Sequence, residues 1–129
     1  MIPWAKPNYH GNEEKYVRQA LKSTWLSDGS FIKNFETKFS NYVNSKFAIS
    51  VTNGTAALNL VYLAMGLKKG DEIIIPGFGY LAAANIALQM GIKPVFADVD
   101  LNTFCVTAEN IKKKITSKTK LIVVIHTYG

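Results

Sequence analysis

Three residues with polar or small side chains, Asn53, Gly54 and Thr55, stand between two apolar runs. The first run, 47–51, predicts a strand, and the second, 55–65, predicts a helix, so the three residues form the turn at a helix N-terminus. Free backbone N–H groups and the positive end of the helix dipole gather at such a turn, and a threonine hydroxyl adds one more donor. This arrangement suits a phosphate group. Ordinary capping of a strand-to-helix turn explains the same residues equally well.

Two aromatic residues, Phe78 and Tyr80, follow the next apolar run in a loop that also contains Gly77 and Gly79. An aromatic face can stack on a planar heteroaromatic ring, and the glycines leave the backbone accessible. On spacing alone, however, the favoured interpretation is that both aromatic side chains pack in the core beneath the loop.

Asp98 and Asp100 come at the end of the third predicted strand, and His126 comes at the end of the last one. A pair of acids at this spacing can bind a metal ion or share a proton. Turn and capping chemistry is the favoured interpretation of the acids, and a structural role is the favoured interpretation of the histidine. The sequence therefore predicts no metal site. It also assigns no catalytic residue, because every lysine falls in a polar turn or at a helix end.

Strands alternate with helices from residue 47 onward. This order predicts a three-layer α/β/α domain with a mainly parallel sheet. Residues 1–46 are expected to form an extended arm and two helices, and residues 47–129 the first part of the α/β domain. The second helix carries an aromatic stripe that we interpret as core, Phe31, Phe35, Phe39 and Tyr42. The expected strands are 47–51, 72–75, 94–97 and 121–125, and the expected helices of the α/β domain are 55–65, 80–90 and 107–115.

The composition narrows the function classes. The chain has 129 residues, of which 48% are hydrophobic, and Cys105 is its only cysteine, which excludes a disulfide framework and a thiolate metal cluster. A reducing cytoplasm is the expected location. No apolar run reaches the length of a membrane span, so no membrane partner is expected. The chain has a net charge of +6. We interpret its lysines as solvated turn residues. A nucleic-acid surface and the attraction of an anionic substrate are the less favoured interpretations.

Several motifs, taken in order, resemble the DegT/DnrJ/StrS-type sugar aminotransferases. The opening, Met1–Pro3 through Gly11–Glu13, is most similar to the perosamine-synthase branch of that family. The resemblance covers the whole chain. The motifs that carry it are Thr24–Gly29, Phe35–Glu36, Thr52–Leu58, Gly70–Pro76, Pro94–Asp100 and His126–Gly129.

This resemblance implies a pyridoxal-phosphate enzyme of the aspartate-aminotransferase fold (fold type I), with this chain as part of its large domain. Such an enzyme transfers an amino group, usually from glutamate, to the keto group of a nucleotide-linked sugar for polysaccharide or related glycan synthesis. Members are typically homodimers with shared active sites. By position, Asn53, Gly54 and Thr55 would hold the cofactor phosphate, and Tyr80 would stack on the pyridine ring. Expected substrate contacts are Trp4, Lys6, Ser27, Phe78 and His126.

The family pattern also extends beyond this chain. The acid that pairs with the pyridine nitrogen and the Schiff-base lysine both lie past Gly129, so we expect an N-terminal part of a longer protein that is inactive by itself. Gly77, Gly79 and Ala83 stand where hydroxyl residues are common in the family. Three alternatives stay open: a sugar dehydratase of the same family, a non-catalytic remnant or interaction protein, and an unrelated nucleotide-binding α/β domain, which the missing glycine fingerprint disfavours.

Overall fold

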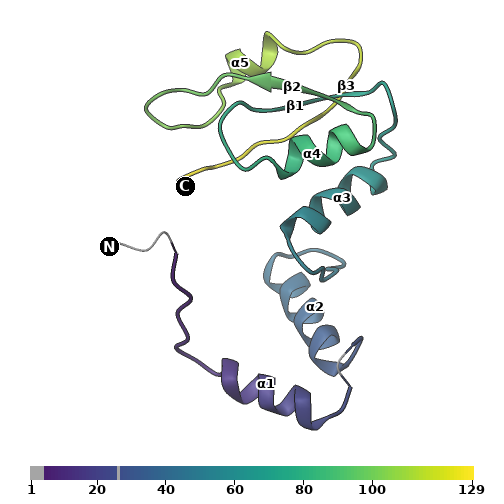
Figure 1. The fold of residues 1–129 in the computed structure, drawn as a ribbon, viewed down its shortest axis with the longest axis vertical. Helices are drawn as coiled ribbons and strands as arrows, with labels where there is room; N and C mark the ends of the chain where they lie inside the picture. The colour runs from purple at the N-terminus through teal and green to yellow at the C-terminus, as the bar shows by residue number, and fades with distance from the viewer. Residues whose placement is uncertain (1–4, 26) are drawn as a thin grey trace. The chain divides into compact units, whose positions relative to one another are not determined.

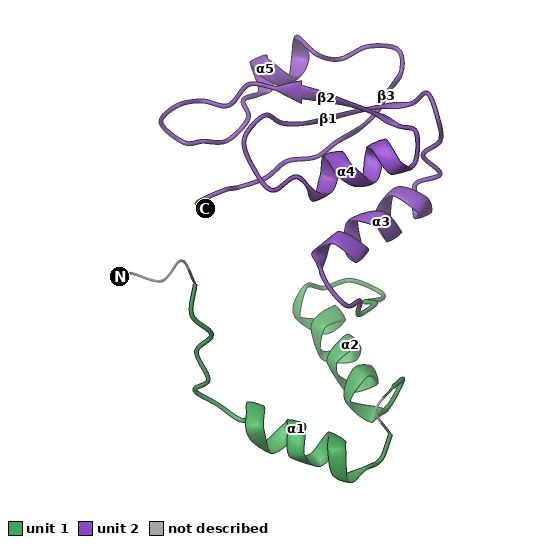
Figure 2. Cartoon of the chain, viewed as in Figure 1, with its two compact units in different colours: residues 1–50 green, residues 51–129 purple. Residues whose placement is uncertain are grey.

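The structure, a computed structural model, describes residues 5–25 and 27–129 and divides into two compact units. Unit 1 spans residues 1–50 and unit 2 spans residues 51–129 (Figure 2). The predicted domain boundary fell four residues earlier, between residues 46 and 47. No helix of the described residues is long and apolar enough to cross a bilayer.

Unit 2 is built on a three-stranded parallel sheet. Its strands are β1 (Glu72–Pro76), β2 (Lys93–Ala97) and β3 (Thr119–Ile122), and β1 lies between the other two (Figure 1). Glu72 pairs with Lys93 on one side and with Thr119 on the other, so all three strands begin at the same edge. Every residue of β1 is buried, as expected for the central strand of a covered sheet.

Helices lie on both faces of this sheet, which confirms the predicted α/β fold class. Helix α4 (Ala82–Gln89) lies against one face, α3 (Gly54–Ala64) packs on α4, and the short α5 (Ala108–Lys112) lies on the other side (Figure 1). The core between α4 and the sheet is aliphatic, with Tyr62 of α3 fully buried beside it. The Tyr62 hydroxyl donates to the Ala83 carbonyl at 3.3 Å and so links α3 to α4.

Unit 1 contains the two predicted helices, α1 (Glu13–Lys22) and α2 (Ser30–Tyr42). Asn12 precedes α1, but its side chain makes no capping hydrogen bond. The Glu36 carboxylate of α2 accepts hydrogen bonds from the Ser50 N–H at 2.8 Å and from the Ser50 hydroxyl at 2.9 Å. These two bonds lower the pKa of Glu36 and hold the segment after α2 against the helix.

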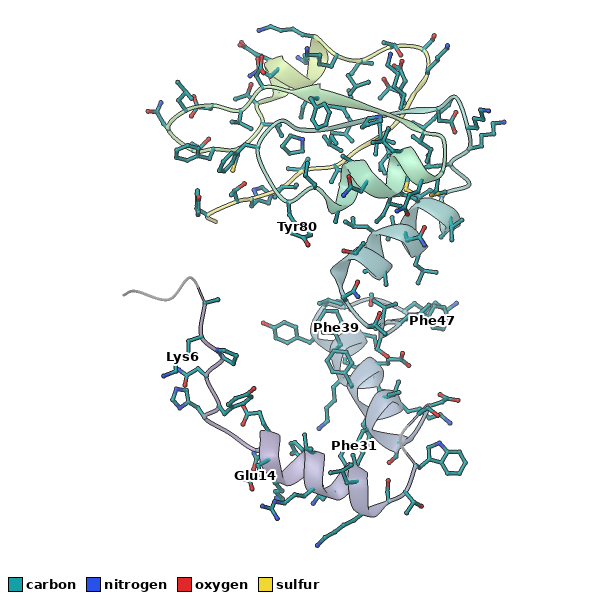
Figure 3. The ribbon with its side chains drawn as sticks, in the orientation of Figure 1. Lys6, Glu14, Phe31, Phe39, Phe47 and Tyr80 are labelled. Carbon is teal, nitrogen blue, oxygen red and sulfur yellow. The ribbon has the colours of Figure 1, made fainter. Side chains whose placement is uncertain are left out.

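The core interpretation of the aromatic stripe on α2 is wrong for the described residues. Phe31, Phe35, Phe39 and Tyr42 are all exposed, from 37% to 88%. Phe31 and Phe39 are labelled in Figure 3. Tyr16 of α1 contacts Phe31 at a ring-centroid distance of 6.2 Å, and Phe35 contacts Phe39. A pair of helices offers too little surface to bury four large rings, so the stripe is amphipathic as predicted, but no second layer among the described residues of unit 1 covers it.

The predicted strand at 47–51 is also wrong. The segment has no regular secondary structure and pairs with no described strand, and Phe47 and Ile49 are 74% and 71% exposed. An extended run becomes a strand only when a neighbouring strand satisfies its backbone groups. The other predicted elements are present with shifted ends: α4 begins at Ala82 rather than residue 80, α5 ends at Lys112 rather than residue 115, and β3 runs from Thr119 to Ile122.

A buried carboxylate joins the three strands at the edge where they begin. The Glu72 side chain accepts hydrogen bonds from the Thr116 hydroxyl at 2.6 Å and from the Lys93 ammonium at 2.9 Å. These two bonds, the Thr116 bond first, lower the pKa of Glu72 below its ordinary value of 4.5.

We expect Glu72 to make the stability of the whole protein depend on pH. Because the folded-state pKa is lowered, its contribution is complete above the unfolded pKa and is lost as the pH falls through the folded value. Glu72→Gln should therefore lower the urea midpoint at pH 7 and flatten the decline of that midpoint below pH 4.5. Glu109→Gln, at an exposed position of α5, is the matched control. Parallel urea-versus-pH curves for the wild type and Glu72→Gln would contradict this prediction.

Candidate functional site

The N-terminus of α3 presents free backbone donors. Asn53 is the N-cap, with an extended backbone (φ −166°, ψ 171°), and its side-chain oxygen accepts the Ala56 N–H at 2.9 Å. That bond satisfies the third N–H of the helix. No described residue accepts a hydrogen bond from the N–H of Gly54 or Thr55. A Cβ built on Gly54 meets no atom within 4 Å, so the side-chain side of this residue is open.

Thr55 and Tyr80 line the same cavity, although 24 positions separate them in the sequence. The cavity has a volume of about 490 Å³ and lies between the start of α3, the loop 79–81 and one side of α4. Tyr80 is 84% exposed, so the predicted core position of this ring is wrong and its faces are free (Figure 3). Two predicted cofactor contacts are thus brought together by the fold.

The cavity also has two polar residues that our sequence reasoning missed, Asn85 and Gln89 of α4. They are four positions apart, so they lie on one side of the helix. Both are exposed, whereas Ala82, Ala83, Ala84, Ile86 and Ala87 of the same helix are buried. Two amides at helical spacing in an otherwise apolar helix were the signal that would have identified this side as a cavity wall.

The loop 77–80 is held against the ends of the other two strands. The Gly77 N–H donates to the Ala97 carbonyl at 2.8 Å, at the end of β2. Gly79 has φ +151°, and a Cβ there would lie 3.1 Å from the Ile125 side chain. A larger residue at position 79 would therefore be both strained and crowded. These two features favour glycine at position 79.

Phe78 does not line the cavity but belongs to an aromatic cluster at the same edge of the sheet. Its ring lies 5.5 Å from that of Phe104, which lies 5.7 Å from that of Tyr128. The Thr127 hydroxyl contacts the Phe104 carbonyl at 3.5 Å, which places the exposed His126 beside this cluster in the chain. Phe104, missed in the sequence, has φ 55°, a left-handed conformation that is uncommon for an aromatic residue.

The remaining predicted site residues lie elsewhere. The Asp100 carboxylate accepts the N–H groups of Asn102 and Thr103, which is the predicted turn role, whereas Asp98 contributes only its backbone carbonyl, to the Asn110 side chain. No group of three or more potential metal ligands occurs within residues 5–25 and 27–129. Lys6 and Ser27 are exposed residues of unit 1, and Trp4 lies outside the described residues, so their substrate contacts stay predictions.

The model of the DegT/DnrJ/EryC1/StrS aminotransferase family matches residues 7–129. GDP-perosamine synthase from Vibrio cholerae is 42% identical to this chain over 130 residues, which cover 100% of the chain and 35% of that relative. The chain thus spans about a third of the relative's length, at its N-terminal part. The match agrees with the predicted family and with its perosamine-synthase branch.

Solved structures of sugar-modifying enzymes also resemble this chain in fold and sequence. A sugar aminotransferase of Streptococcus pneumoniae, Spr1654 in its PLP form, is 30% identical with a TM-score of 0.87, covering 94% of this chain and 31% of its own. GDP-4-keto-6-deoxy-D-mannose-3-dehydratase of Escherichia coli, with bound hydrated PLP, is 32% identical with a TM-score of 0.86, covering 95% and 33%. Both of these similar structures bear the predicted cofactor, pyridoxal phosphate, which confirms that prediction. The predicted fold type I is confirmed for this chain. The chain belongs to the DegT/DnrJ/EryC1/StrS aminotransferase family.

Proposed function

We propose that the whole protein is a pyridoxal-phosphate-dependent aminotransferase that converts a nucleotide-linked keto sugar to an amino sugar, with glutamate as amino donor. It would act in the cytoplasm as a homodimer with shared active sites and serve polysaccharide or glycan synthesis. The observation that carries this proposal is the cavity that Thr55 and Tyr80 share in a chain 42% identical to a GDP-perosamine synthase.

The residues of this chain fit the cofactor. The N–H groups of Gly54 and Thr55 and the Thr55 hydroxyl supply donors for the phosphate, and the helix dipole favours its charge. Asn53 orients these donors by capping the helix through Ala56. The free face of Tyr80 gives the ring a stacking surface. When bound, the cofactor serves as the electron sink that makes proton removal beside the amino nitrogen feasible.

The binding and orienting groups lie in this chain, whereas no residue of the chain is assigned to proton transfer. In the family resemblance, the acid at the pyridine nitrogen and the lysine that holds the cofactor belong to the region past Gly129. We infer that residues 1–129 by themselves bind the cofactor weakly and do not turn over substrate. Detectable transamination by purified residues 1–129 would contradict this inference.

A dehydratase is the second candidate function. The E. coli dehydratase matches this chain with a TM-score of 0.86, close to the value for the aminotransferase Spr1654. The two activities share the cofactor site that this chain supplies, so the described residues support both. The aminotransferase is favoured because GDP-perosamine synthases match this chain in sequence at 42% identity over 99–100% of its length.

The test uses the purified full-length protein loaded with pyridoxal phosphate. It is incubated with GDP-4-keto-6-deoxy-D-mannose and nitrogen-15 glutamate, and the sugar product is analysed by mass spectrometry. An aminotransferase places the label in the sugar. A dehydratase yields a deoxygenated sugar without the label. Failure of the full-length protein to bind pyridoxal phosphate would overturn both candidates.

A further inference from the structure

The charges of unit 2 are segregated along its sheet. Unit 2 has eight lysines and no arginine, all eight lysines are exposed, and they occupy the turn before β1, the start of β2 and the segment from the end of α5 into β3. We call this set the lysine surface. It consists of Lys68, Lys69, Lys93, Lys112, Lys113, Lys114, Lys118 and Lys120.

Contacts bring these segments together. The Glu72 N–H donates to the Lys118 carbonyl at 2.9 Å, which joins the starts of β1 and β3. The Gly70 N–H donates to the Gly91 carbonyl at 3.1 Å, and the Lys69 side chain lies over Gly91, just before β2. The connection from α5 runs back over the sheet to the same edge (Figure 1). The lysines therefore belong to one continuous region of unit 2.

Eight lysines in this region are offset by three acids, Asp71, Glu72 and Glu109, so an excess of positive charge remains. Within the part of the chain that the structure describes, Lys93 is the one member of the surface with an ion pair, to Glu72. Asp71 accepts the Lys68 backbone N–H and so closes its own turn. The other acids of unit 2 are Glu109, in the first turn of α5, and Asp98 and Asp100, after the opposite end of β2.

The position of the surface separates it from the candidate site. The cavity with Thr55 and Tyr80 lies beyond the carboxyl ends of the strands, whereas Lys68, Lys69, Lys93 and Lys118 lie at their amino ends. Lys113 is the exception, since its ammonium contacts the Asn110 side chain, which donates to the Asp98 carbonyl just after the carboxyl end of β2. None of the eight lysines lines the cavity, so the lysine surface is separate from the candidate site.

We propose, in place of the sequence-based expectation of no membrane partner, that the lysine surface docks the protein on a membrane rich in acidic phospholipid. Lysines attract such a surface as point charges without a fixed geometry. Ile115, 52% exposed between Lys114 and Lys118, offers an apolar side chain for the lipid boundary. A nucleic acid is disfavoured because the surface has no arginine fork and no aromatic residue between positions 105 and 125 on which bases stack. Docking through this surface leaves the cavity edge facing the solvent.

The test measures co-sedimentation of the full-length protein with vesicles of phosphatidylglycerol and phosphatidylcholine, and with vesicles of phosphatidylcholine alone. The variant Lys112→Gln, Lys113→Gln, Lys114→Gln should bind the acidic vesicles about 100-fold more weakly, since each lysine near such a surface contributes roughly fivefold. The control, Lys15→Gln, Lys22→Gln, Lys38→Gln, removes the same charge from exposed positions of unit 1 and should change binding less than about threefold. Raising the salt should abolish the difference between the two variants.

Three results would overturn the proposal: no binding to the acidic vesicles, equal binding to phosphatidylcholine alone, or an equal loss in both triple variants. Tighter binding of a single-stranded RNA than of acidic vesicles would assign the surface to nucleic acid instead. The pyridoxal-phosphate absorbance of each variant serves as an independent check of folding. This proposal does not depend on the proposed reaction, because neither the lysines nor their controls line the cavity.

Discussion

Replacing Gly54 with proline in the full-length protein is expected to weaken pyridoxal-phosphate binding by roughly 10- to 150-fold, the equivalent of about 1.5–3 kcal/mol for one hydrogen bond to a charged group. Gly54 is the first residue of α3, and proline is well tolerated at that position because its missing N–H has no partner within the helix. The preceding residue, Asn53, already has the extended backbone that a following proline requires. The substitution therefore removes a phosphate donor while keeping the helix.

Gly54→Ala is the matched control for that experiment. Alanine keeps the N–H, and its Cβ would meet no protein atom within 4 Å. Cofactor dissociation constants would be measured by absorbance titration of the apoprotein, with circular dichroism to verify the fold. If the proline and alanine variants bind equally well, the Gly54 N–H does not hold the phosphate, and the assignment of this turn must be abandoned.

Much of this fold follows from local sequence patterns. The continuous apolar run of β1 and the Asn53–Gly54–Thr55 turn before an alanine-rich helix each specify an element without help from distant residues. The failures arise where an element needs a partner. Residues 47–51 have the composition of a strand but pair with no described strand, and the α2 stripe has the spacing of a buried face without a layer to cover it. Hydrophobic pattern predicts which face is to be buried, but the burial itself depends on what packs there.

The residues of the candidate site also differ in whether the local sequence predicts their positions. Thr55 was predictable because helix N-termini bind phosphate through local geometry. Local geometry could not decide whether Tyr80 lies in the core or at the cavity. That position depends on how the loop 77–80 rests on Ala97 and Ile125. Spacing favoured burial, whereas the family resemblance placed the ring at the cofactor, and the exposed Tyr80 agrees with the latter. The pairing of Phe78 with Phe104 and Tyr128 needs three separate segments and lay beyond any local pattern.

The second large effect is expected from Ile73, the second residue of β1. Its side chain is fully buried among Tyr62, Ile75 and the alanines of α4, so it joins the sheet to the two helices that form the cavity. Ile73→Ala in the full-length protein should lower the free energy of unfolding by about 2–5 kcal/mol, because it loses apolar burial and leaves a void that the packed helices fill only in part. The measurement is a urea denaturation curve at pH 7.

Ile73→Val is the graded control at the same position, with an expected loss of about 0.5–1.5 kcal/mol because only one methyl group is removed. The cofactor affinity of both variants, measured well below their unfolding midpoints, should match that of the wild type, since Ile73 does not line the cavity. Equal unfolding curves for the wild type and Ile73→Ala would mean that the contact between α4 and β1 does not stabilise this domain. A loss of cofactor affinity without a loss of stability would instead mean that β1 positions the phosphate-binding turn directly. The packing of α3 on α4 predicts no such direct effect.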